Sequence, residues 1–161
     1  ADRALSEATS LLVVRHWAEA EQAARRALED DPESSASALA LVKALIAQGK
    51  GRQAVDLLDR FPAGNEVVMA ERLRPLAGLL KVAEEGGVSE NELGAEYLQA
   101  ARLIARGNLA AALDGLLDIL RRDKHYRGGE ARKVFLTMLE LMGDEDPVTR
   151  EYRDELASVL F

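Results

Sequence analysis

Residues 17–32 read WAEAEQAARRALEDDP, an alanine-rich helical stretch that closes on a proline. This stretch decides the fold because the pattern around it recurs 34 residues later (54 − 20 = 34). The first copy has Ala4, Leu11, Ala20 and Ala24, and the second has Ala38, Leu45, Ala54 and Leu58. A fixed period of this length is typical of repeat proteins, in which each unit buries its apolar face against the next.

The repeating unit resembles the tetratricopeptide repeat. The second helix of that repeat carries an aromatic residue, a small residue at the helix crossing, an Ala-Leu pair and a closing proline. Trp17, Ala20, Ala27-Leu28 and Pro32 match these positions. Two antiparallel helices joined by a short turn approach closely only where one side chain is small. The crossings are therefore expected at Ala20, Ala54, Ala112 and, in the last hairpin, Val148.

The third copy is displaced, because Ala112 follows Ala54 at an offset of 58 (112 − 54 = 58). Subtracting one period leaves 24 residues (58 − 34 = 24), which is enough for one extra helix. The sequence therefore predicts an all-α, tetratricopeptide-type helical-hairpin solenoid of about nine helices with one inserted extra helix. We expect a single domain over 1–161, with hairpins at about 2–30, 34–60, 91–123 and 129–160 and the extra helix at about 65–84.

Composition excludes several function classes. The net charge of −7 argues against binding to phosphate backbones or anionic lipid, so we expect no nucleic-acid partner and no membrane. Without cysteine, the chain has no disulfide, thiolate nucleophile or thiol metal site. His16 and His125 have no second ligand at helical spacing, and no serine has a plausible His–acid pairing. We predict no enzyme activity, no catalytic residue, no metal and no cofactor.

Two local features have simple structural explanations. Basic residues gather between Arg121 and Lys133, where they complement the dipole at a helix C-terminus, although a protein contact there is an alternative. His16 follows Arg15 at a turn that usually has a glycine. We expect His16 to accept the left-handed conformation there, because histidine tolerates it better than most residues.

The C-terminal stretch is more specific. Residues 129–133 (GEARK) open a helix, 141–147 (LMGDEDP) end it, and the chain closes on EYRDELASVLF at 151–161. This end resembles that of the chaperedoxin family (YbbN/CnoX), bacterial proteins in which tetratricopeptide repeats follow a thioredoxin-fold domain. Asp154 departs from the family pattern, which has a second basic residue after Arg153.

The chaperedoxin resemblance implies a cytoplasmic co-chaperone of the stress response. Such a protein binds unfolded or oxidised client proteins and passes them to the chaperonin and Hsp70 systems. The resemblance also implies a thioredoxin-fold domain upstream of Ala1, and a chain that begins with Ala rather than Met is expected to be a fragment of a longer protein.

In this family the last helix is the expected chaperonin contact, here 147–160 with Phe161. One apolar face, from Val148 to Leu160, is expected to pack on helix 129–142. The residues expected to contact the partner are Arg150, Tyr152, Arg153, Asp154, Leu156, Leu160 and Phe161.

Alternatives remain open on the sequence alone. After the co-chaperone interpretation, the next one is a scaffold for one specific folded partner or for self-association, and the third is an appendage that positions substrates for a thioredoxin-type oxidoreductase. The inner helices are rich in Ala, Leu and Val, with Lys43 as an isolated charge. Such a lining suits an apolar groove for unfolded segments or amphipathic helices, and it suits ordinary core equally well.

Overall fold

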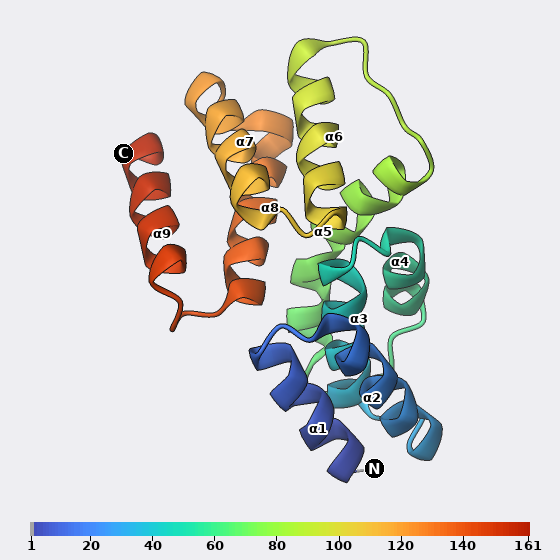
Figure 1. The fold of residues 1–161 in the computed structure, drawn as a ribbon. Helices are drawn as coiled ribbons and strands as arrows, with labels where there is room; N and C mark the ends of the chain where they lie inside the picture. Colours follow the sequence, from blue (N-terminus) through green and yellow to red (C-terminus); the bar gives the residue numbers. More distant parts are fainter. Residues whose placement is uncertain (1) are drawn as a thin grey trace.

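In the computed structural model, which describes residues 2–161, these residues form nine helices and no strand (Figure 1). The helices are α1 (Asp2–Val13), α2 (Trp17–Asp30), α3 (Ser35–Ala47), α4 (Gly51–Asp59), α5 (Val67–Glu84), α6 (Glu92–Ala105), α7 (Leu109–Arg122), α8 (Tyr126–Met142) and α9 (Pro147–Leu160). The predicted fold class, an all-α helical-hairpin solenoid, is confirmed.

The start of α8 is the largest departure from the predicted bounds. The helix was expected from residue 129, but it begins at Tyr126. Residues 127, 128 and 129 have φ values of 53°, 64° and 91°, so a left-handed turn precedes the regular part of the helix. Two adjacent glycines make such a turn inexpensive, because glycine carries no Cβ to clash.

The helices pack in chain order, from the α1–α2 hairpin to α9 at the opposite end (Figure 1). α1 packs on α2, α3 on α4 and α6 on α7. The extra helix α5 lies between the second and third hairpins, where it contacts α3, α4, α6 and α8. It continues through Pro75, although proline lacks the backbone donor of a helix interior. α9 packs on α7 as well as on α8, so it closes the stack.

Helix starts agree with the capping chemistry of the sequence. Ser34, Asn91, Asn108 and Asp146 each accept a hydrogen bond through the side chain from a backbone N–H of the first turn that follows. These contacts satisfy amides that have no partner within the helix. Pro147 takes the first helical position of α9, where a missing N–H costs nothing.

The small residues at the crossings are fully buried in the first three hairpins. Ala20, Ala54 and Ala112 each have 0% of their surface exposed. The last hairpin differs from the prediction, because Thr149 is buried there while Val148 is 39% exposed. A longer turn explains the shift. In the third hairpin the buried small residue, Ala112, comes five positions after Gly107 (112 − 107 = 5), whereas in the last hairpin Thr149 comes six positions after Gly143 (149 − 143 = 6).

The turn ahead of each crossing needs a left-handed residue. Gly49 and Gly107 have φ values of 75° and 80° at this position, and Arg15 takes it in the first hairpin with a φ of 63°. The expectation for His16 was therefore wrong, since its φ is −86°. A non-glycine residue in this region carries strain of about 1 kcal/mol, so the Arg15 side chain must have a compensating role.

Close backbone approach also fixes the extra helix. A Cβ on Gly51 would lie 2.1 Å from the backbone nitrogen of Lys81, so only glycine lets α4 begin directly against α5. The stack of hairpins and the inserted helix thus depend on the same condition, a missing or minimal side chain at the point of contact.

Replacing Ala112 with leucine tests this packing. The larger side chain would overpack the α6–α7 crossing, and we expect a loss of about 1–3 kcal/mol in the free energy of unfolding. Chemical denaturation measures the change. The control is Ala95→Leu on the exposed face of α6, which should change stability little. Equal stabilities for the two variants would contradict the crossing at Ala112.

Candidate interaction surfaces

The structure divides the predicted contact residues of α9 into two sets. Tyr152 and Leu156 are buried against α7 and α8. Leu160 is half-buried, and the exposed residues are Arg150, Arg153, Asp154 and Phe161. Burial gives Tyr152 and Leu156 a packing role, so any partner reaches α9 through its charged outer face and its last two residues.

Tyr152 anchors α9 from the inside. Its hydroxyl lies 2.9 Å from Oδ1 of Asp114 and 3.2 Å from the carbonyl oxygen of Ala110. Its ring packs edge to face with the ring of Phe135, and the two ring centres are 6.3 Å apart. Burial, together with the hydrogen bond to Asp114, raises the pKa of Tyr152 to about 12. The phenol therefore stays protonated at neutral pH and donates its hydrogen to α7, which fixes the register of α9.

The outer face of α9 is charged and solvated. Arg153 pairs with Asp144 at 2.9 Å, and Glu155 lies 3.9 Å from Arg121. Arg150 and Asp154 have no ion-pair partner among residues 2–161. Phe161 is 97% exposed, an unusual position for a large apolar side chain. This face combines free charges with one exposed aromatic ring.

A second surface is an open groove along α8, which we call the α8 groove. At one end it is a hollow of about 560 Å³ between α8, the α1–α2 turn and α3, with Leu12, Val13 and Lys43 in its lining. At the other end it is a hollow of about 500 Å³ between α8 and the first half of α5. Glu140 lines both hollows, so they adjoin one another along α8, and the name covers the two together.

Arg15 bounds the first end of the α8 groove. Its guanidinium donates to the carbonyl oxygen of Met142 at 2.9 Å and pairs with the carboxylate of Asp146. The contact joins the turn of the first hairpin to the loop of the last. Arg15 and a backbone N–H donated by Val148 hold the pKa of Asp146 below its ordinary value. We call this pair of contacts the clasp at Arg15, and it offsets the strain in the backbone of that residue.

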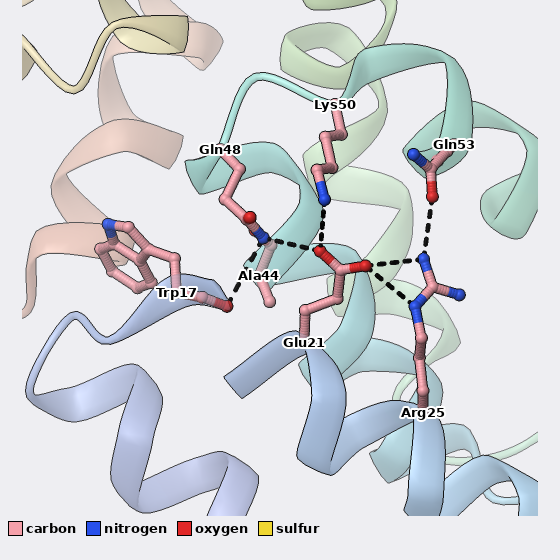
Figure 2. Close-up of polar contacts among 7 residues, drawn as sticks. All are labelled: Trp17, Glu21, Arg25, Ala44, Gln48, Lys50 and Gln53. Atoms are coloured by element: carbon pink, nitrogen blue, oxygen red, sulfur yellow. Dashed lines mark hydrogen bonds and ion pairs between the residues drawn. The ribbon is translucent and has the colours of Figure 1, made fainter. Parts of the chain in front are cut away.

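A buried carboxylate joins the first two hairpins (Figure 2). Glu21 on α2 is 4% exposed and receives hydrogen bonds from Gln48 and Lys50 of the α3–α4 turn, at 2.9 and 2.8 Å, and from Arg25 at 2.9 Å. Burial by itself would raise the pKa of Glu21, but these three donors outweigh it and hold the pKa below its ordinary value. The full set of partners identifies a structural anchor rather than a reactive acid.

The basic stretch of the sequence is largely neutralised. Arg121 pairs with Asp118, Arg122 pairs with Glu92 and Glu96, and the Arg127 guanidinium lies 5.2 Å from the centre of the Tyr97 ring. Arg132 and Lys133 on α8 have no ion-pair partner among residues 2–161. Most of these basic side chains therefore have a partner within the fold.

Other kinds of site have no support in the described residues. Within 2–161, no three residues of the types His, Asp and Glu gather closely enough to hold a metal ion. No helix in that range has the length and apolarity needed to span a bilayer.

Sequence reasoning missed Glu21 and Arg15. Glu21 has no counterpart in the second copy, where Val55 stands (55 − 21 = 34), so the repeat pattern gives no signal for it. Arg15 did carry a signal, because it stands 34 positions before Gly49 (49 − 15 = 34) and breaks the glycine pattern of the turns.

Comparison with known proteins gives two family matches. A model described as a tetratricopeptide repeat matches residues 79–161, which is 83 of the 161 residues (161 − 79 + 1 = 83). A second model with the same description matches residues 15–66. Residues 67–78, the larger part of α5, lie between the two matches.

One relative is an uncharacterized protein of Haemophilus influenzae. It is 28% identical to this chain over 142 residues, which cover 81% of this chain and 64% of that protein. The chain thus spans less than two thirds of the length of this relative.

The Glu21 anchor makes stability depend on pH. Because the folded-state pKa lies below the ordinary value of 4.5, the carboxylate stabilises the fold above that pH, and the contribution is lost as the pH falls through the folded pKa. Glu21→Gln should cost about 1–3 kcal/mol at pH 7, and the difference from wild type should shrink below pH 4.5. Denaturation at a series of pH values measures it.

The matched control for Glu21 is Glu29→Gln, which removes the same charge from an exposed position on α2. This variant should change stability little at any pH. A Glu21→Gln deficit that stays constant down to pH 3 would show that the carboxylate charge is not what stabilises the anchor.

Proposed function

Because this chain belongs to the tetratricopeptide-repeat family, whose members bind protein partners, we propose that it is the protein-binding part of a bacterial co-chaperone of the chaperedoxin (YbbN/CnoX) kind. It holds unfolding or oxidised client proteins in the cytoplasm and passes them to the chaperonin and Hsp70 systems. Tetratricopeptide domains are generally non-catalytic scaffolds, and binding is accordingly the activity that we assign.

The observation that carries this proposal is the form of α9. Its sequence is where the likeness to the chaperedoxins is most specific, and one face of the helix is held by Tyr152 and Leu156 while the other is exposed. A terminal helix needs only a polar outer face for solubility. The exposed ring of Phe161 goes beyond that requirement, and aromatic residues and arginine are both enriched in binding surfaces.

The α8 groove supplies the second activity, client binding. Val13 and Val68 line it and are 77% and 67% exposed. Exposed apolar side chains in a hollow bind the apolar segments that unfolding proteins release. We further propose that a thioredoxin-fold domain precedes Ala1 in the full-length protein and carries any redox chemistry, since this chain has no cysteine.

Client binding predicts that the chain suppresses aggregation of a thermally unfolding test protein and reduces no disulfide. Light scattering, with the chain at several-fold molar excess, measures suppression. The double variant Val13→Glu/Val68→Glu should lose it, because two charges would enter the apolar lining. The control is Val88→Glu, at a valine that is 86% exposed on the α5–α6 connection and outside the α8 groove.

Aggregation that is unchanged by the wild-type chain would remove client binding from this part of the protein. Capture of one folded partner without any suppression, or a concentration-dependent dimer in sedimentation, would instead favour the scaffold or self-association alternative.

Docking on a purified chaperonin should depend on the outer face of α9. Arg153→Glu and Phe161→Ala leave the buried face intact, so both should fold normally and bind the chaperonin about tenfold more weakly. Arg60→Glu, which reverses an exposed charge on the C-terminal end of α4, is the control and should bind as wild type does. Biolayer interferometry gives the affinities, and undiminished binding of both α9 variants would exclude this helix as the docking element.

A further inference from the structure

The α8 groove has a charge order along its length. Lys133 and Arg72 line the end beside α5, and neither has an ion-pair partner among residues 2–161. Glu145 lines the end beside the α1–α2 turn, Glu140 lies where the two hollows adjoin, and both are likewise unpaired within that range. The free charge of the groove therefore changes from positive to negative along α8.

Two other carboxylates at the acidic end are already paired. Asp146 forms an ion pair with Arg15, and Asp144 forms one with Arg153. Within the described part of the chain, the only unpaired cation that lines the acidic end is the half-buried Lys43, so two free carboxylates outnumber one ammonium. Charges without partners can pair with a ligand of opposite charge without breaking an ion pair inside the protein.

The dimensions of the groove limit the length of the ligand. Lys133 and Met142 are the outermost residues of α8 in the lining, and they are nine positions apart on the helix (142 − 133 = 9). A helical rise of about 1.5 Å per residue gives a length of about 14 Å. A ligand helix of between two and three turns, or an extended segment of about four residues, spans this distance.

Apolar side chains run along the groove between the charged ends. Leu136 and Leu141 from α8 are half-buried, and Val68 and Val13 face them from α5 and α1. A helix that presents apolar residues at spacings of three and four matches a stripe of this kind, because its own apolar face runs parallel to its axis.

We infer that the α8 groove binds a short amphipathic helix of a partner protein in one orientation, with the acidic end of that helix beside Lys133 and Arg72 and its basic end beside Glu140 and Glu145. This inference rests on the proposed function only for the premise that the groove receives protein segments. It adds the chemistry of the segment and the direction in which it lies.

The chain contains its own probe of direction. Trp17 is its only tryptophan, and it lines the acidic end of the groove. The test ligand is a synthetic peptide of about 12 residues, with leucines at helical spacing, two lysines at one end and two glutamates at the other. A dansyl acceptor on the lysine end should quench Trp17 fluorescence on binding more strongly than the same group on the glutamate end.

Charge variants complete the test. Glu140→Lys should weaken binding of the unlabelled peptide about tenfold, whereas Glu29→Lys, on the exposed face of α2, should not. The double variant Lys133→Glu/Glu140→Lys should reverse the preference between the two labelled peptides. These positions are exposed, so circular dichroism should show an unchanged fold.

Equal quenching by the two labelled peptides, or wild-type affinity in Glu140→Lys, would overturn the inference. That result is distinguishable from failure of the proposed function, because suppression of aggregation depends on the apolar lining and not on the order of the charges. A chain that suppresses aggregation but binds the peptide without direction retains the co-chaperone role and loses the oriented site.

Discussion

The structure depends on how closely its helices approach. Ala20, Ala54 and Ala112 are fully buried where paired helices cross, and Gly51 lets α4 begin against the backbone of α5. A larger side chain at any of these points would separate two helices by more than the loops between them allow. Because each hairpin is the support for the next, spacing at the crossings sets the position of every later helix, α9 included.

A core of alanine and leucine packs tightly but specifies register weakly, since small apolar side chains slide past one another at little cost. Polar contacts fix the register of the helices instead. Glu21 fixes the first hairpin to the second, Tyr152 fixes α9 to α7, and Arg15 joins the two ends of the stack. All three lie where hairpins meet, and each is hydrogen-bonded to backbone or to an oppositely charged group. Directional bonds of this kind reward one arrangement and penalise its neighbours.

The inserted helix connects fold and function. α5 follows the second hairpin where a regular stack would have placed the third, and it provides the wall of the α8 groove that carries Val68 and Arg72. The clasp at Arg15 bounds the groove at its other end. The proposed client site thus belongs to the irregular features of this solenoid, while the proposed chaperonin contact on α9 belongs to its regular end. The two surfaces meet at the ion pair of Asp144 and Arg153, because Asp144 lines the groove and Arg153 lies on the outer face of α9.

The sequence by itself determined the helices, their pairing and the inserted element, because helical periodicity, capping residues and the 34-residue repeat are local properties of the chain. It also indicated which residues of α9 carry charge. Tertiary structure decided which of them are accessible, placing Tyr152 inside and Val148 outside through one additional residue in the preceding turn. It alone brought Arg15 to Asp146, Lys50 to Glu21 and Val68 to Glu140. Contacts between residues far apart in the chain depend on the combined geometry of several helix crossings, which cannot be deduced from a local sequence pattern.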